Sequence, residues 1–187
     1  MIDGAFLKVV LNKAVFHPVV TDNGVSVAKL RESDPSAGLK AVDIRGVSPD
    51  AVLLKMDVGA PPADMLRKEL GQRCRCDYIL LTEHCGKRFL VYIDLKTAAK
   101  GKLQKGGVVK QFKGARCMLM YMDAIIDVFH GQRGFFKSFD ECRYVAFYKP
   151  SLYKKPTRPL PMKNDAPERF MKYPNPIRPT VRELVGI

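Results

Sequence analysis

The sequence predicts a domain of the α/β (α+β) class, and three observations indicate it. Two segments rich in β-branched and aromatic residues, 76–82 and 89–96, flank a short turn at Gly86, which predicts a pair of strands. The segment 108–129 carries apolar residues at steps of three and four, which predicts a helix with one buried face. A further apolar segment, 141–149, is expected to be the last strand of the core.

The N-terminal part, residues 1–58, is expected to be β-rich. Asn23-Gly24 lies between β-forming residues and predicts a tight hairpin turn. Two further short strands are expected at 42–45 and 51–57. No catalytic pattern occurs here, so these residues are interpreted either as an extension of the sheet or as a small lobe facing the substrate.

The middle of the chain, residues 59–149, is expected to form the core. A helix is predicted over 61–71, because prolines are tolerated in a first helical turn and Gly71 suits a helix end. From Pro150 the composition changes, since eight of the thirteen prolines lie in 150–187 together with eight basic residues and three acids. We interpret this part as a Pro-rich basic C-terminal arm that contacts a nucleic acid or, equally, as a tail lying on its own domain.

The chain is strongly basic, with a formal net charge of +13. Such a surplus favours polyanionic partners, chiefly nucleic acid or an anionic membrane surface. No apolar run approaches the ~20 residues that span a bilayer, and the N-terminus does not resemble a signal peptide. A cytoplasmic protein without membrane attachment is therefore expected.

Five cysteines form an odd count without the spacing of a disulfide scaffold. Reduced, buried thiols are the expected state. The alternative is a zinc site across a hairpin, because zinc accepts cysteine and histidine ligands. Its ligands would be Cys74, Cys76, His84 and Cys85.

Polar side chains stand at the ends of the two central strands. Asp94 and Lys96 are two positions apart, so they project from the same face of a strand. If the two strands form a hairpin, Asp77 at the start of the first strand lies opposite Asp94. Two carboxylates beside an ammonium group suit metal-assisted cleavage of a phosphodiester, because magnesium prefers carboxylate oxygens. The alternative is an ordinary ion pair at a strand end.

The order of these residues resembles the PD-(D/E)xK nuclease superfamily, the restriction-endonuclease-like enzymes. An acid opens one strand, Asp-Leu-Lys ends the next, and a helix with an early glutamine follows. The resemblance covers about residues 61–149 and implies an αβββαβ core with a mixed sheet. It matches Asp77 and Asp94 with the metal ligands of the family. It matches Lys96 with the catalytic lysine and Gln111 with the helix glutamine of the exonuclease-like branch.

Other positions match this family less well. Glu69 is a weaker match for a metal-binding acid on the first core helix, and the favoured alternative is a solvated helix glutamate that pairs with Arg73. Cys76 stands where the motif has proline. Ala115 stands where a tyrosine follows the glutamine by four residues.

Basic residues without any acid follow the proposed catalytic lysine and are expected to contact phosphates of the nucleic-acid backbone. They are Lys100, Lys102, Lys105, Lys110 and Lys113. With the resemblance, the predicted function is a Mg- or Mn-dependent endo- or exodeoxyribonuclease. Its predicted substrate is DNA, with RNA as the alternative, and it is expected to act as a homodimer or with a partner protein. The alternatives are a non-catalytic nucleic-acid-binding module, a ribonuclease or toxin-like effector, and a peripheral protein on anionic lipid.

Overall fold

The computed structural model describes residues 2–32, 39–58, 73–96, 105–149, 163–174 and 178–186. The strands in these ranges are β1 (Phe16–His17), β2 (Val19–Asp22), β3 (Val25–Arg31), β4 (Ala41–Arg45), β5 (Val52–Lys55), β6 (Tyr78–His84), β7 (Lys87–Lys96), β8 (Glu141–Tyr148) and β9 (Met171–Pro174). The helices are α1 (Gly4–Val10), α2 (Lys105–His130) and α3 (Val181–Val185), with the short 3-10 turns η1 (Lys13–Val15), η3 (Phe136–Ser138) and η4 (Pro167–Arg169).

The described strands form two sheets, one of six strands in the order β1-β5-β6-β7-β8-β9 and one of three in the order β2-β3-β4. Strands β5, β6 and β7 are antiparallel, whereas β8 and β9 continue the larger sheet in parallel. The larger sheet is therefore mixed. The α+β class that the sequence predicts is confirmed.

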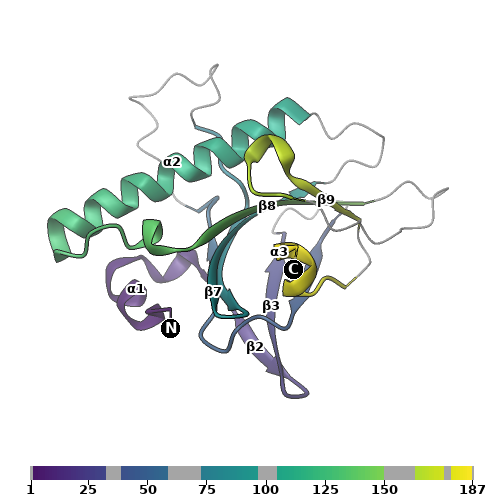
Figure 1. The fold of residues 1–187 in the computed structure, drawn as a ribbon, viewed down its shortest axis with the longest axis horizontal. Coiled ribbons are helices and arrows are strands. Elements are labelled where there is room, and N and C mark those ends of the chain that lie inside the picture. The colour runs from purple at the N-terminus through teal and green to yellow at the C-terminus, as the bar shows by residue number, and fades with distance from the viewer. Residues whose placement is uncertain are drawn as a thin grey trace.

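The larger sheet separates two apolar cores. Helix α2 covers one face, and the smaller sheet with α3 covers the other (Figure 1). Strand β7 is buried on both faces, because its alternate residues enter different cores. Leu90 and Tyr92 pack on the α2 side, whereas Val91 and Ile93 face the smaller sheet. This double burial explains why the strand is almost continuously apolar in sequence.

The predicted central hairpin is present. Cys85 and Gly86, with φ of 51° and 74°, form the turn between β6 and β7. Positive φ at both turn residues is the geometry of the tight turns that suit the twist of paired strands. The hairpin predicted at Asn23-Gly24 joins β2 to β3 with the same geometry.

The N-terminal segment is β-rich as expected, but it begins with the helix α1. The Asp3 side chain accepts a hydrogen bond from the Phe6 backbone N–H, which caps the first turn. Leu7 is the one α1 residue that is fully enclosed, and it enters the core under α2. One buried side chain in a short element leaves little periodicity to recognise in the sequence.

The C-terminal residues that the structure describes are part of the domain. Strand β9 pairs with β8, and α3 closes the core between the two sheets. The Thr180 hydroxyl and the Glu183 carboxylate form a capping box at the start of α3. Residues 163–174 and 178–186 therefore lie on the domain, and contact of this basic segment with a nucleic acid stays a prediction.

The predicted helix over 61–71 lies outside the described residues. The helix predicted over 108–129 corresponds to α2, which ends at His130 and is followed by Gly131 with a φ of 67°. None of the helices in the described ranges is long and apolar enough to cross a membrane.

Candidate active site

The two predicted acids meet at one end of the central hairpin. Tyr78 pairs with Ile93, so Asp77, one residue earlier, lies opposite Asp94. The Leu95 backbone N–H donates to Asp77 Oδ2 at 2.5 Å, which holds this carboxyl against the end of β7. Hairpin register alone therefore brings Asp77 and Asp94 together, as the sequence predicted.

Lys96 and Gln111 complete the cluster. Lys96 Nζ lies 2.7 Å from Asp94 Oδ2 and donates to Gln111 Oε1 at 2.6 Å. Gln111 comes from the second turn of α2, which covers the face of the sheet toward which Asp94 and Lys96 project. The structure thus brings together the four residues that the sequence predicted as catalytic. The Gln111 side-chain oxygen accepts from Lys96, so the two hydrogens on its amide Nε2 point away from this lysine and can donate to another acceptor.

Burial controls the charge of the acid pair. The Asp94 side chain is fully buried, and burial raises its pKa, although the Lys96 ammonium lowers it in part. Burial and the neighbouring charge of Asp94 raise the pKa of Asp77 to about 8. Two carboxyls that interact this closely titrate as a pair, so without a cation they retain a proton near neutral pH.

The Asp94 oxygens have unused acceptor capacity. Both are buried, and neither receives a well-aligned hydrogen bond from the residues that the structure describes. Their close neighbours are the Lys96 ammonium, which lies 2.7 Å from Oδ2, and the Asp77 carboxyl. Buried carboxylate oxygens with spare lone pairs are suited to a hard divalent cation.

The described ranges bring no third acid, histidine or cysteine into a group that could hold a metal. The predicted third acid, Glu69, lies outside these ranges. Asp77 and Asp94 are therefore the described residues whose oxygens could hold magnesium or manganese.

A close backbone contact positions α2 over the acids. A Cβ at Gly114 would lie 1.8 Å from the carbonyl oxygen of Cys74, so only glycine permits this approach. Cys74 precedes Asp77 by three residues, and Gln111 lies almost one turn before Gly114. The contact therefore joins the segment that carries one acid to the helix turn that carries the glutamine.

The sequence did not identify Lys172 as a neighbour of this site. Asp94 pairs with Ala146, and Ala146 pairs with Lys172, so the three residues form one row across parallel strands. Residues paired in this way project to the same face, with about 5 Å between neighbouring strands. Ala146 is fully buried between the acid and the exposed lysine. The alternation of Met171 to Tyr173 is the sequence signal that could have revealed this strand.

The predicted phosphate-contacting lysines have different environments. Lys110 is exposed on α2, and Lys113 is exposed but forms an ion pair of 2.6 Å with Glu168. Lys105 is the first residue of α2. Lys100 and Lys102 lie outside the described residues.

The alternative zinc site is not assembled. Cys74 and Cys76 precede β6, whereas His84 and Cys85 lie at its other end. Seven strand residues separate the two ends by roughly 20 Å, too far for shared ligation. Cys76 is fully buried, and burial together with the nearby carboxyls raises the pKa of its thiol well above the usual range. Its thiol therefore remains protonated.

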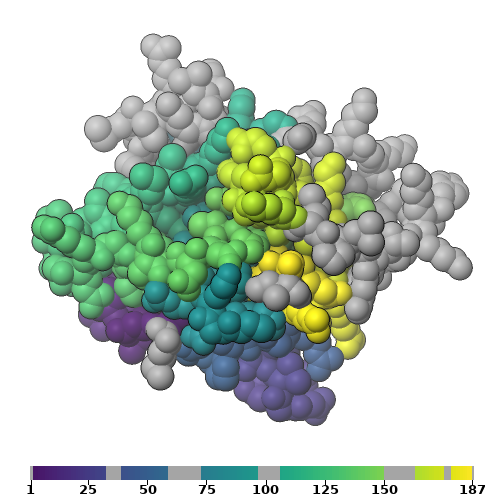
Figure 2. All heavy atoms as spheres, viewed as in Figure 1, coloured from purple at the N-terminus to yellow at the C-terminus, as the bar shows by residue number. Residues whose placement is uncertain are grey.

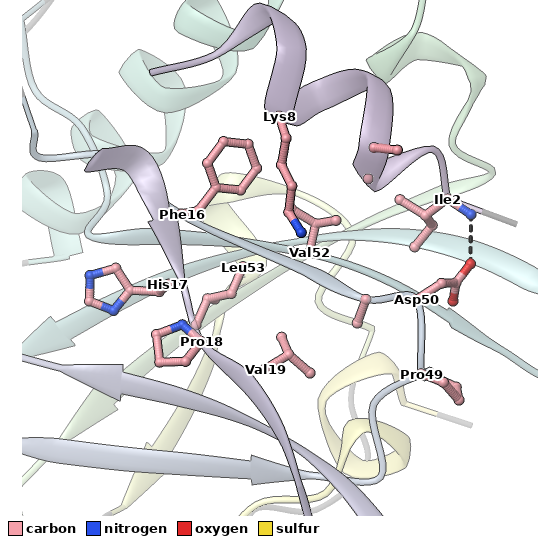
Figure 3. A pocket seen from close by; sticks show the side chains of 13 residues that line it. Ile2, Lys8, Phe16, His17, Pro18, Val19, Pro49, Asp50, Val52 and Leu53 are labelled. Carbon is pink, nitrogen blue, oxygen red and sulfur yellow. Dashed lines mark hydrogen bonds between the residues drawn. The ribbon is translucent and has the colours of Figure 1, made fainter. Parts of the chain in front are cut away.

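A separate pocket of about 760 Å³ lies between α1 and the edge formed by β1 and β5 (Figure 3). Its walls are mainly apolar, and the Lys8 side chain extends over Val52. The lining carboxylate, Asp50, accepts a hydrogen bond of 2.7 Å from the Ile2 backbone N–H. This carboxylate is thus engaged in fixing the N-terminus, and none of the acid-pair residues lines the pocket.

Comparison of the chain with protein-family models, with curated proteins and with solved structures found no match.

Proposed function

We propose that this chain is a nuclease that hydrolyses DNA phosphodiester bonds with the help of magnesium or manganese. The observation that carries the proposal is the meeting of Asp77 and Lys96 around the fully buried Asp94 carboxylate. The order of three antiparallel strands, a helix and a parallel strand supports a restriction-endonuclease-like core of the PD-(D/E)xK type. The net charge of +13 supports a polyanionic substrate.

The donor set fits a divalent cation. Asp77 and Asp94 would hold it through carboxylate oxygens, and Glu69 remains the predicted further ligand. A cation bound there would supply positive charge to stabilise the phosphoryl oxygens during displacement. Its binding would also displace the proton that the carboxyl pair otherwise retains.

The remaining chemistry belongs to Lys96 and Gln111. We assign the orientation of the attacking water to Lys96 Nζ, which is partly exposed while anchored to Asp94 and Gln111. Its positive charge offsets negative charge that develops on the phosphate. Gln111 Nε2 is assigned a supporting role as a donor to a water or phosphate oxygen.

Nucleic-acid binding is assigned to lysines on the same face. Lys110 and Lys172 are exposed there, and Lys113 can exchange its surface ion pair for a phosphate at small cost. Lys100, Lys102 and Lys105 remain predicted contacts. The cytoplasmic location also remains a prediction.

The proposal is tested by cleavage of supercoiled and linear DNA with magnesium, with manganese and with chelator. Lys96→Met should abolish cutting while DNA affinity and the unfolding temperature change little. Lys87→Met removes a lysine at the opposite end of the same strand and serves as the matched control. Full cleavage by Lys96→Met, or cleavage that persists in chelator, would contradict the mechanism.

Metal binding is measured apart from cleavage. Calorimetric titration with Mn²⁺ should show binding to the wild type and loss of binding in Asp94→Asn. Asp140→Asn, which alters an exposed carboxylate at the start of β8, should bind as the wild type does. Equal binding by wild type and Asp94→Asn would remove Asp94 from the metal site.

A non-catalytic nucleic-acid-binding module is the second candidate. The observation that favours it is the convergence of two acids rather than three within the described ranges. Such a module would bind DNA with full affinity in Asp94→Asn and would cut under no metal condition. Parallel assays on RNA distinguish a ribonuclease or toxin-like effector from the proposed deoxyribonuclease.

A further inference from the structure

The C-terminal half of α2 exposes an apolar stripe. Its large members are Met120, Tyr121, Ile125, Val128 and Phe129, which are 53%, 50%, 37%, 79% and 76% exposed. This half of the helix forms one edge of the molecule, beyond the start of β8 (Figure 1; green at the left in Figure 2). The opposite face of the same helix, with Leu119 and Ile126, is already buried in the core.

The spacing of the exposed stripe fits a second helix. Four exposed residues recur at steps of four, three and four: Cys117, Tyr121, Ala124 and Val128. Steps of this kind form the straight seam along which two helices pack. Contiguous apolar surface of this kind marks an interaction site.

Local charge limits what can occupy this seam. Residues 117–132 are the longest stretch of the sequence without lysine or arginine. Of its two acids, Asp123 is buried, and Asp127 forms an ion pair of 3.4 Å with the exposed Arg133. Helices that lie on anionic lipid need basic residues beside the apolar face, and contact with DNA phosphates needs them too. The stretch also gives two copies of a chain of net charge +13 a place to approach where arginines stand only at its borders, at positions 116 and 133.

We propose that this face is a homodimer interface in which α2 of each chain packs antiparallel against α2 of the other across a two-fold axis. In this register Tyr121 lies opposite Ala124 of the partner subunit, and Cys117 lies opposite Val128 of the partner subunit. Large side chains thus meet small ones, and each contact occurs twice, as a two-fold interface requires. Antiparallel helix dipoles add a favourable term.

The expected affinity is modest. A seam of this length is expected to bury less than the roughly 800 Å² per partner of a standard stable interface, which places it among weak, reversible interfaces. The remaining positive charge of the two chains opposes association, so added salt should strengthen the dimer. DNA binding by the same protein should weaken with salt, which separates the two activities.

Sedimentation equilibrium of the full chain tests the interface. The wild type should be a concentration-dependent dimer, and Val128→Asp should be a monomer at tenfold higher concentration. Val128→Asp lowers the positive net charge of the chain and so weakens the repulsion between two copies. A loss of the dimer in this variant therefore cannot come from net charge. Thr21→Asp makes the same charge change at an exposed position of β2 and should dimerise as the wild type does. A monomeric wild type would overturn the proposal, whether or not it binds vesicles or another protein.

An engineered disulfide tests the register. With Cys85→Ser to remove the other exposed thiol, Val128→Cys should form a covalent dimer with Cys117 of the partner subunit under mild oxidation. The further change Cys117→Ser should abolish most of this product. Equal cross-linking with and without Cys117 would contradict the antiparallel register, even if a dimer is present.

Discussion

At the scale of single residues, the acid pair has a consequence for stability. Asp77 has a pKa of about 8 in the folded chain against 3.8 as the ordinary value, so the folded protein retains a proton that the unfolded chain releases between these pH values. The stabilisation is complete below the lower value and is lost as the pH rises through the higher one. The free energy of unfolding should therefore fall with rising pH in this window.

We predict that this fall, up to about 1.4 kcal/mol per pH unit for one proton, is visible between pH 5 and pH 8 in metal-free buffer. Asp77→Asn should flatten the profile, since an amide accepts the Leu95 hydrogen bond without titrating. Denaturant unfolding at several pH values measures both chains. Burial lowers the pKa of His17, which makes the free energy of unfolding rise with pH. This contribution is the same in both chains, so subtracting one profile from the other removes it. Identical slopes would refute the shift.

Gly114 has no side chain, and this lets α2 approach the Cys74 carbonyl closely. We predict that Gly114→Ala costs about 1–3 kcal/mol or more, because its methyl group would overlap the Cys74 carbonyl. Gly107 lies in the same helix with open space around it, so Gly107→Ala is the matched control and should gain up to about 1 kcal/mol. Thermal and denaturant unfolding report the difference. A neutral Gly114→Ala would show that α2 can move away from the segment of Asp77.

At the scale of elements, one buried asparagine connects three segments. Asn164 Nδ2 donates to the Leu184 carbonyl at 2.9 Å and to the Tyr144 carbonyl at 3.3 Å. The Tyr144 backbone N–H donates in turn to the backbone carbonyl of Asn164 at 2.9 Å. Strand β8, the chain before η4 and helix α3 are thus held by one side chain with no exposed surface.

We predict that Asn164→Ala destabilises the fold by about 2 kcal/mol or more, because two buried carbonyls lose their donor. Hydrogen exchange should increase first in α3, since this short helix depends on packing rather than on its own length. Arg169→Ala removes an exposed ion pair with Asp165 nearby and should cost less than about 1 kcal/mol. Equal losses in both variants would mean that α3 is held by its apolar contacts alone.

At the scale of the whole molecule, the basic charge should govern binding more than any single base contact. We predict that log affinity for duplex DNA falls linearly with log salt and that Lys172→Ala reduces the slope by about 1, as one lost phosphate contact would. Lys137→Ala changes an exposed lysine near the opposite end of β8 and should leave the slope unchanged. Fluorescence anisotropy at several salt concentrations measures the slopes. Equal slopes for the wild type and Lys172→Ala would place the DNA elsewhere.

The sequence by itself determined the central hairpin and the meeting of its polar residues. Asp77, Asp94 and Lys96 belong to adjacent strands joined by a two-residue turn, so alternation and register suffice to bring them together. Gln111 follows in the next element, and the apolar spacing of α2 indicated which face it lies beside. Local patterns predict contacts of this kind, because few chain conformations satisfy them.

Only the tertiary structure decided the features that depend on distant segments. The row from Asp94 to Lys172 requires the register of two parallel strands, which no turn specifies. The contact between Gly114 and Cys74 depends on how closely α2 approaches the sheet. The same packing decided which apolar residues of α2 remain exposed, because a helix apolar on several faces does not reveal in sequence which face its own core will cover.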